Sequence, residues 1–302
     1  MAQVLQIISR GPFSLSAAAG FGFGPTDGHA PEWDGAMRLC FALDGGRGYA
    51  GAVLRQAELN GPVSVELQLQ DGGELDVALA QVARIVSLDH DGREFVALGE
   101  SDPVLGALQH AHPGQRPVLF PSPYEAAAWS VISARRPAAQ GAKVRAELGA
   151  RYGATFELAG STLLAFPQPE QLAELDDEFP GLNDTKLERL RGVARAALDG
   201  DLDVARLHQL GPERGYEDVQ RLSGIGPFYA GLIVLRASGF ADAWVGGDRV
   251  PEPKGAASAA RYYGLGESLT AAQLGQLAER WRPFRTWALV LIRLAGARGT
   301  TV

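Results

Sequence analysis

The sequence predicts an α+β protein: a small mixed α/β domain followed by a mostly helical region. Three observations support this. Period-two alternation of apolar residues occurs only before residue 112, a proline-rich segment follows it, and helical periodicity continues almost to the end. We therefore expect an N-terminal domain at 1–112. The helical region is expected at 113–302, as two helical subdomains that flank an active-site cleft.

The N-terminal domain contains clear strand and helix signals. The stretch 62–70, PVSVELQLQ, places Val63, Val65, Leu67 and Leu69 on one face, as in a half-buried strand. The stretch 36–44, AMRLCFALD, predicts a second strand, and 74–88 has the apolar spacing of a helix that covers one face of the sheet.

The segment HPGQRPVLFPSP, at 112–123, has four prolines and marks the boundary, after which the strand signals end. Apolar spacing predicts ten helices in the second region. Their expected ranges are 123–134, 137–152, 169–177, 184–199, 203–209, 214–222, 227–238, 256–263, 270–281 and 284–297.

Composition excludes several classes of protein. No run approaches 18 apolar residues and the start lacks a secretory-signal pattern, so we expect a cytoplasmic, nucleoid-associated monomer that contacts no membrane. The single cysteine, Cys40, rules out an internal disulfide framework or a multi-cysteine metal site in this chain. We expect no cofactor and no metal bound by side chains.

The net charge of −7 argues at first against nucleic acid. The charge is, however, unevenly distributed, because residues 1–120 contain 7 basic and 14 acidic residues and therefore carry all of it. The remainder is neutral overall and rich in arginine, which suits contacts with phosphates. Overall charge therefore does not exclude a DNA-binding helical region.

The stretch LSGIGPFYA, at 222–230, places two glycines between two predicted helices. Gly224 and Gly226 permit a tight hairpin, Ile225 anchors it in the core, and Pro227 fits the first helical position. The second helix then begins with unpaired N–H groups, which suit an anion such as a DNA phosphate. A plain connection between helices is the alternative interpretation of the hairpin alone.

A glycine-rich loop, FADAWVGGDRV, follows about 22 residues later and ends at Asp248. The intervening helix folds back, so this carboxylate is expected to lie near the bound strand. A helix N-cap is the alternative role of Asp248, and the two roles are compatible.

From LSGIG to Asp248 the sequence resembles the helix-hairpin-helix DNA glycosylases. More narrowly, PSPYEAAAWSVIS, FPQPEQLAEL and LAERWRPFRTWALVLIRLA resemble the AlkA-type branch, the bacterial 3-methyladenine DNA glycosylase II enzymes. The resemblance covers about 121–297. It implies base excision repair by a hydrolase that flips alkylated purines, 3-methyladenine and 7-methylguanine, out of double-stranded DNA and excises them.

The resemblance also assigns roles to residues. Asp248 is the catalytic carboxylate, which stabilises positive charge on the sugar and orients water. Phe228 stands where relatives with lyase chemistry have lysine, which implies a monofunctional enzyme. The hairpin residues Gly224, Ile225, Gly226, Phe228 and Tyr229 are expected to bind DNA. A monovalent cation is expected at the main chain of Leu222 and Gly224.

The sequence departs from the family pattern at three places. Ala134 and Arg135 replace a glutamine and a wedge leucine, so Arg135 is the expected wedge into the duplex. Phe21 and Phe228 match pocket aromatics, whereas Leu232 and Arg293 replace a pocket tyrosine and tryptophan. Trp281 and Trp287 are expected to pack in the core. The open alternatives are a glycosylase for deaminated or etheno-adducted bases, and a non-catalytic module that binds lesions.

Overall fold

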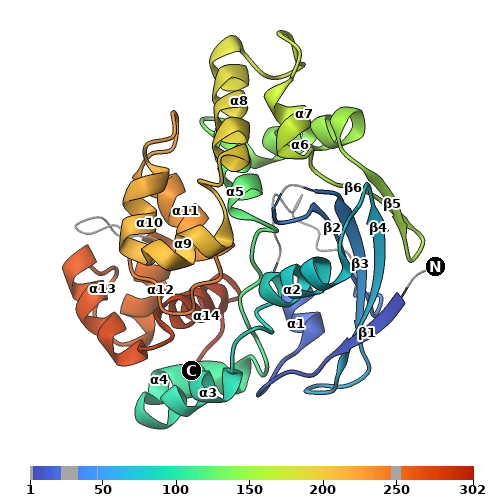
Figure 1. Cartoon of the computed structure of the whole chain (residues 1–302). Helices are drawn as coiled ribbons and strands as arrows, with labels where there is room; N and C mark the ends of the chain where they lie inside the picture. Colours follow the sequence, from blue (N-terminus) through green and yellow to red (C-terminus); the bar gives the residue numbers. More distant parts are fainter. Residues whose placement is uncertain (1–2, 22–32, 46, 246–252) are drawn as a thin grey trace.

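A four-stranded antiparallel sheet and fourteen α-helices make up most of the part that the computed structural model describes, residues 3–21, 33–45, 47–245 and 253–302 (Figure 1). The sheet has the order β1–β4–β3–β2. Its strands are β1 (Gln3–Ile7), β2 (Met37–Ala42), β3 (Tyr49–Gln56) and β4 (Val63–Gln70). The two strands predicted from the sequence are confirmed, and the α+β class with them.

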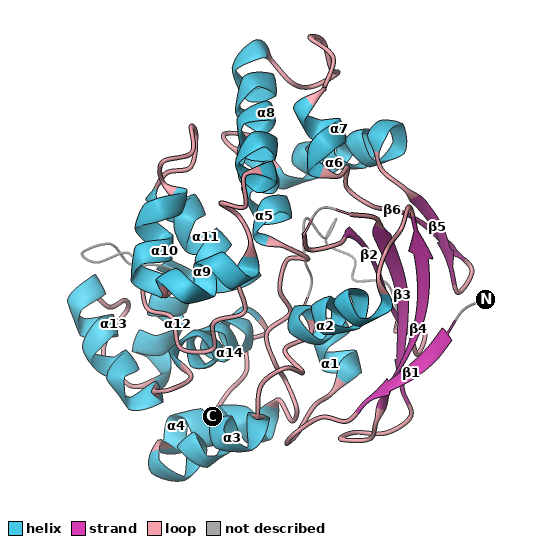
Figure 2. Ribbon diagram, in the orientation of Figure 1, coloured by secondary structure: helices cyan, strands magenta, loops and turns pink. Residues whose placement is uncertain are grey.

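The two faces of the sheet are covered by different elements (Figure 2). Helices α1 (Leu15–Ala19) and α2 (Leu75–Ile85) pack on one face, as the periodicity of 74–88 predicted. A hairpin of β5 (Thr155–Leu158) and β6 (Ser161–Leu164) packs on the other, where Phe156 lies against Gly51. The expectation that strands end at residue 112 is therefore wrong.

The hairpin β5–β6 escaped prediction because its apolar residues are few. Only Phe156 and Leu158 alternate as buried positions in β5, and β6 buries little. Four residues give too short a period-two pattern to separate from a loop. The tertiary contact with the large sheet, not local periodicity, stabilises these strands.

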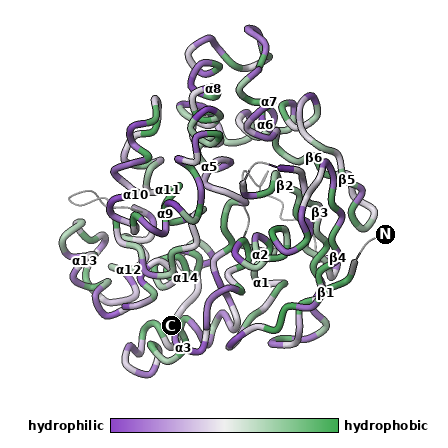
Figure 3. The backbone as a smooth tube through the Cα atoms, in the orientation of Figure 1, coloured by the Kyte–Doolittle hydropathy of each residue, from purple (hydrophilic) through white to green (hydrophobic). Residues whose placement is uncertain are grey.

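The predicted helices of the second region are confirmed, with ends that shift by a few residues. They are α5 (Pro123–Ser133), α6 (Ala138–Tyr152), α7 (Pro169–Ala173), α8 (Asp184–Leu198), α9 (Val204–Leu210), α10 (Pro212–Val219), α11 (Pro227–Ala237), α12 (Pro253–Tyr262), α13 (Ala271–Ala278) with the 3-10 turn Glu279–Trp281, and α14 (Arg285–Ala297). Figure 3 shows that α10 is largely hydrophilic, whereas α2 and the sheet contain hydrophobic stretches.

Two further helices, α3 (Gly92–Ser101) and α4 (Pro103–Ala111), precede the predicted boundary. Their residues Phe95, Leu105 and Leu108 belong to the same core as α12–α14, which also contains Trp281 and Trp287. The boundary at residue 112 stays a prediction, but packing crosses it here and at β5–β6. The packing role predicted for the two tryptophans is confirmed, with exposures of 0% and 3%.

A second helical core holds α5–α11 together, and α5 and α11 are packed against each other within it. The hairpin between α10 and α11 lies at the edge of this core, with Ile225 buried in it and Ser223 and Gly224 exposed. In the described residues no helix is both long and apolar enough to cross a membrane.

Candidate DNA-binding cleft and base pocket

The turn between α10 and α11 is the tight hairpin that the glycines predicted. Gly224 has φ +92°, a conformation that side chains rarely adopt, and a Cβ there would lie 2.8 Å from Cδ of Arg189. Ile225 is 4% exposed and belongs to the core of α5–α11, which confirms its anchoring role. Glycine is therefore required at 224 by both conformation and space.

Gly226 serves a different purpose. Its φ of −88° is open to any residue, and a Cβ there would meet open space. The backbone conformation at this position therefore does not require glycine. Absence of a side chain at Gly226 instead leaves room beside the start of α11, where another backbone can approach.

Helix α11 begins with exposed donors. Pro227 occupies the first helical position as predicted, and Gly226 gives no side-chain cap. The N–H of Ala230 bonds back to the carbonyl of Gly226 at 2.9 Å, whereas those of Phe228 and Tyr229 precede the first intrahelical bond. These two amides and the positive end of the helix dipole form a site for an anion.

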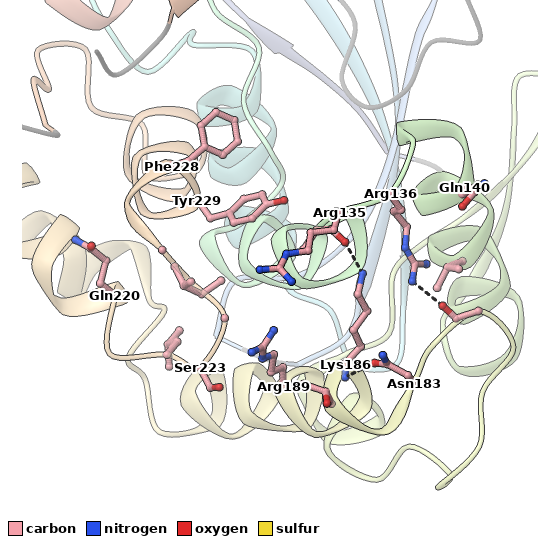
Figure 4. A pocket seen from close by; sticks show the side chains of 18 of the residues that line it. Arg135, Arg136, Gln140, Asn183, Lys186, Arg189, Gln220, Ser223, Phe228 and Tyr229 are labelled. Atoms are coloured by element: carbon pink, nitrogen blue, oxygen red, sulfur yellow. Dashed lines mark hydrogen bonds between the residues drawn. The ribbon is translucent and has the colours of Figure 1, made fainter. Parts of the chain in front are cut away.

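The hairpin is one wall of a cleft of about 1440 Å³, and α8 with the turn after α5 forms the other (Figure 4). Six basic side chains and one acidic side chain, Glu147, line it. The basic residues are Arg135, Arg136, Lys143, Lys186, Arg189 and Arg221. The cleft is thus strongly positive although the chain is negative, which favours a polyanion.

Sequence reasoning missed most of these basic residues because they come from four separate segments. One signal was available: Lys186 and Arg189 are three apart in a predicted helix, so they share a face. Arg189 packs on Gly224 with its side chain carbons, and its guanidinium points into the cleft in Figure 4. Basic side chains therefore supplement the backbone amides, which the sequence had suggested as the main phosphate ligands.

The turn after α5 carries the predicted wedge. Arg135 has φ +55°, a left-handed conformation that turns the chain sharply from α5 toward α6. Its side chain extends into the cleft, toward the hairpin (Figure 4). Nζ of Lys186 donates to the carbonyls of Ile132 and Ala134 at 2.8 and 2.9 Å. These bonds satisfy carbonyl groups at the end of α5 and hold the connection between α5 and α6 in place.

Lys186 also has an unusual protonation equilibrium. Burial, together with the positive charges of Arg136 and Arg189, lowers the pKa of Lys186 to about 8. Arg136 itself donates to the carbonyl of Gly181 at 2.7 Å. The charge of the cleft therefore falls as the pH rises through about 8.

A second, smaller pocket of about 140 Å³ adjoins the hairpin between α11, residues 243–245 and α14. Three predicted pocket residues, Phe228, Leu232 and Arg293, line it together, although 65 residues separate the first from the last. Phe21 does not line this pocket. The centroid of its ring lies 4.8 Å from Cζ of Arg236, and Arg236 does line the pocket.

Phe228 connects the two hollows. It lines both the cleft and the small pocket, and it is 66% exposed although it is a large apolar residue. Its ring meets that of Tyr229 edge to face, with centroids 5.3 Å apart. An aromatic ring held at a junction in this way suits a stacked base.

Three further expectations concern Asp248, metal-binding side chains and the monovalent cation. Asp248 lies outside the described residues, and its role stays a prediction. No cluster of three metal-binding side chains occurs in the ranges that the structure covers. At the expected cation position the carbonyl of Leu222 accepts from the N–H of Ile225 at 3.0 Å, while its second lone pair leaves room for another ligand.

No family model matches the chain. Among curated proteins, a probable bifunctional transcriptional activator/DNA repair enzyme AlkA of Mycobacterium tuberculosis is 27% identical over 298 residues, 94% of this chain and 55% of the relative. DNA-3-methyladenine glycosylase 2 of Escherichia coli is 28% identical over 191 residues, 62% of this chain and 63% of that protein. The chain thus spans little more than half the length of these relatives.

Two solved structures share the fold over almost the whole chain. The 3-methyladenine DNA-glycosylase from Archaeoglobus fulgidus has a TM-score of 0.75 at 20% identity, covering 99% of this chain and 100% of that one. The Clostridium acetobutylicum 8-oxoguanine glycosylase/lyase, solved with double-stranded DNA, has a TM-score of 0.65 at 15% identity, covering 99% and 98%.

The chain therefore has the fold of these two glycosylases, with a helix-hairpin-helix turn between α10 and α11. Its sequence is similar to AlkA and to DNA-3-methyladenine glycosylase 2, which supports the resemblance found in the sequence.

Proposed function

We propose that this chain is a monofunctional DNA glycosylase that excises alkylated purines, chiefly 3-methyladenine and 7-methylguanine, from double-stranded DNA. One observation carries the proposal: a cleft lined by six basic side chains and by the start of α11 opens beside a small pocket of about 140 Å³, and Phe228 lines both. The names of the AlkA-type relatives support the same activity.

The proposed mechanism begins with the DNA backbone. Amides at the start of α11 bind one phosphate, and Arg189 and the other cleft cations bind its neighbours. Arg135 enters the duplex at the lesion and replaces the extruded nucleotide in the base stack. The flipped base then lies against Phe228 in the small pocket.

Asp248 is the proposed catalytic residue. As the glycosidic bond breaks, positive charge develops on the sugar, and an ionised carboxylate stabilises that charge and orients the attacking water. The products are the free base and an abasic site in an unbroken strand. No cofactor takes part in these steps.

The proposal of a monofunctional mechanism depends on where the lysines of the chain lie. The chain has three lysines, and Phe228 occupies the position after the hairpin where relatives with lyase chemistry have one. Lys186, with a pKa of about 8, is the lysine most readily deprotonated in the cleft, but its Nζ is engaged with two carbonyls of α5. We therefore expect no borohydride-trapped complex of the wild type with abasic-site DNA, and a trapped band lost in Lys186→Met would disprove this point.

The central experiment measures release of methylated bases from alkylated duplex DNA by the wild type and by Asp248→Asn. Wild type should release base, with strand breaks only after alkali, and the variant should be about 10²–10³-fold slower. Binding of abasic-site DNA by the variant shows that the cleft remains intact. Equal release by both proteins would remove Asp248 from the mechanism, and tight binding without release would favour a lesion-binding module.

The monovalent cation at Leu222 and Gly224 is a further proposal. Such an ion would lie between main-chain carbonyls of the hairpin and a DNA phosphate, and it would add positive charge where α11 begins. Binding of duplex DNA in potassium, sodium and tetramethylammonium chloride at one ionic strength tests it. Affinity that is the same in all three salts would argue against the ion.

A further inference from the structure

The turn that follows α5 has a backbone conformation that normally belongs to glycine. Ala134 has φ −53° and ψ 125°, and Arg135 has φ +55°. The N–H of Arg136 donates to the carbonyl of Ser133 at 3.2 Å and closes the turn. These are the features of a type II turn with Arg135 at its third position, where a positive φ favours glycine. An arginine at this position therefore strains the backbone.

Four other non-glycine residues in the described part of the chain have a positive φ. They are Asn60, Asp71, Ser87 and Ala159. Asparagine and aspartate tolerate this conformation best, and Ala159 precedes a glycine in the turn between β5 and β6. Arg135 is the one of the five that lines the cleft, where its side chain extends toward the hairpin (Figure 4). The strained position thus carries a side chain that the proposed mechanism uses.

Two basic side chains connect this turn to the region where α8 begins. Nζ of Lys186, in the first turn of α8, donates to the carbonyls of Ile132 and Ala134 at 2.8 and 2.9 Å. Nη2 of Arg136 donates to the carbonyl of Gly181 at 2.7 Å, in the connection that precedes α8. The turn is therefore bonded to a neighbouring segment on both sides of Arg135.

Lys186 compensates for a hydrogen bond that the turn removes from α5. In an α-helix the carbonyl of Ile132 would accept from the N–H of Arg136, four residues later, but the turn directs that N–H to Ser133. The ammonium of Lys186 donates to Ile132 instead, and its three N–H groups allow it to reach Ala134 as well. Loss of this ammonium would favour a longer α5, in which Arg135 has a negative φ.

We propose that Lys186 is a positioning residue, which holds the turn 133–136 in its glycine-type conformation and thereby presents Arg135 to the DNA. The inference rests on the proposed function, in which Arg135 enters the duplex at the lesion, and it adds the residue that sets the geometry of this step. Because the strained conformation already exists in the free protein, extrusion of a base requires no rearrangement of the turn. Lys186 thus acts on excision through Arg135, in addition to its charge in the cleft.

The test is a double-mutant cycle, measured as single-turnover excision from a duplex with one 7-methylguanine at protein concentrations that saturate binding. Arg135→Gly and Lys186→Met should each slow excision by about 10-fold, the effect of losing one stacking contact with a base. The double variant should be no slower than Arg135→Gly, because Lys186 acts through a side chain that is absent there. Lys186→Arg keeps the charge and the donors, so it should restore most of the rate.

Thermal melting separates the role of Arg135 from a purely structural one. Glycine adopts a positive φ without strain, so Arg135→Gly should melt at the wild-type temperature or above it while excision slows. Ala159→Gly is the matched control, because it relieves a φ of +46° in a turn outside the cleft and the small pocket. It should leave the rate of excision unchanged.

Hydrogen exchange tests the turn without DNA. The amide of Arg136 should exchange with deuterium faster in Lys186→Met than in wild type, because the bond to Ser133 opens more often. The strands β3 and β4 should exchange alike in both proteins, which shows that the variant is folded. If Lys186→Met does not fold, Lys186→Gln, which keeps neutral donors, takes its place in both experiments.

Losses that multiply in the double variant, or a rate for Lys186→Met equal to that of wild type, would overturn the inference. If the wild type releases no base, the proposed function itself fails, and exchange at Arg136 still decides whether Lys186 holds the turn. Normal excision by the wild type together with unchanged exchange in Lys186→Met defeats only the role of Lys186.

Discussion

The cleft and the small pocket share Phe228 but are built from opposite chemistries. The cleft is wide and lined by six basic side chains from the turn after α5, from α6, from α8 and from the hairpin. The pocket is about a tenth as large and mostly apolar, and its charge comes from two arginines. The comparison shows how a chain of net charge −7 can present a positively charged surface and, next to it, a small, mostly apolar pocket.

This difference predicts that the cleft sets the affinity for DNA, whereas the pocket sets the choice of base. In the proposed function, cleft residues contact what every nucleotide has, a phosphate, so changes there should affect all DNA alike. The proposed contacts of the pocket residues are with an extruded base only, so changes there should affect excision and its base preference. The following variants test whether DNA affinity and base preference depend on different residues in this way.

Among variants that affect DNA affinity, the largest effect is expected at Gly226. Replacing it by valine leaves the backbone unstrained and meets open space within the protein, yet it places a side chain where a phosphate must reach the amides of α11. Losing one charged hydrogen bond of about 1.5–3 kcal/mol predicts roughly 10–100-fold weaker binding with an unchanged melting temperature.

Gly192→Val is the matched control for Gly226→Val. Gly192 also faces open space, but it lies on α8 outside the cleft lining, so its affinity for duplex DNA should match wild type. Titrations with a fluorescent duplex measure both variants. Equal affinity of Gly226→Val and wild type would show that the start of α11 does not hold the backbone.

Truncation of Phe228 to alanine should slow excision by about 10-fold, since stacking on one base is worth about 1–3 kcal/mol. Because this side chain is 66% exposed, the melting temperature should change little. Binding of undamaged duplex should also change little, in contrast to Gly226→Val. Leu265→Ala, 52% exposed and outside both hollows, is the control. A loss of duplex affinity equal to the loss of excision would place Phe228 in the cleft alone.

Arg189→Leu should weaken binding of damaged and undamaged duplexes by the same few-fold factor. If Arg189 meets one phosphate, the slope of log affinity against log salt should fall by about 1. Arg195→Leu, an exposed arginine on the same helix but outside the cleft, should leave the slope unchanged. A change confined to lesion-containing DNA would contradict the separation of affinity from selection.

The smallest effect is the pH dependence of binding. Because the pKa of Lys186 is lowered to about 8, its positive charge is present below that pH and is lost above it. A DNA phosphate favours the charged form, so duplex affinity should fall by a few-fold between pH 7 and 9, with uptake of a proton on binding.

Lys186→Met should remove that pH step, whereas Lys143→Met, another cleft lysine, should keep it. Measurements at constant ionic strength, with phosphate-free buffers, isolate the effect. A step of the same size in Lys186→Met and wild type would assign it to another group.

Sequence patterns determined the features that depend on neighbours along the chain. Apolar spacing gave the helices of the second region, and Pro227 with Gly224 fixed the hairpin, because helix starts and positive φ are local properties. The motif around 222–230 also predicted the start of α11 at Pro227, where the N–H groups of Phe228 and Tyr229 precede the first intrahelical bond. These features follow from backbone sterics and hydrogen bonding within a few residues.

Tertiary structure alone decided the rest. It brought Phe228, Leu232 and Arg293 to one pocket, gathered basic residues from four segments into the cleft, and placed Lys186 on the carbonyls of α5. Burial of apolar faces brings these segments together, and neither periodicity nor total charge records which faces meet. The net charge of the chain therefore gave no sign of the positive cleft, and the lowering of the Lys186 pKa arises only in the folded protein.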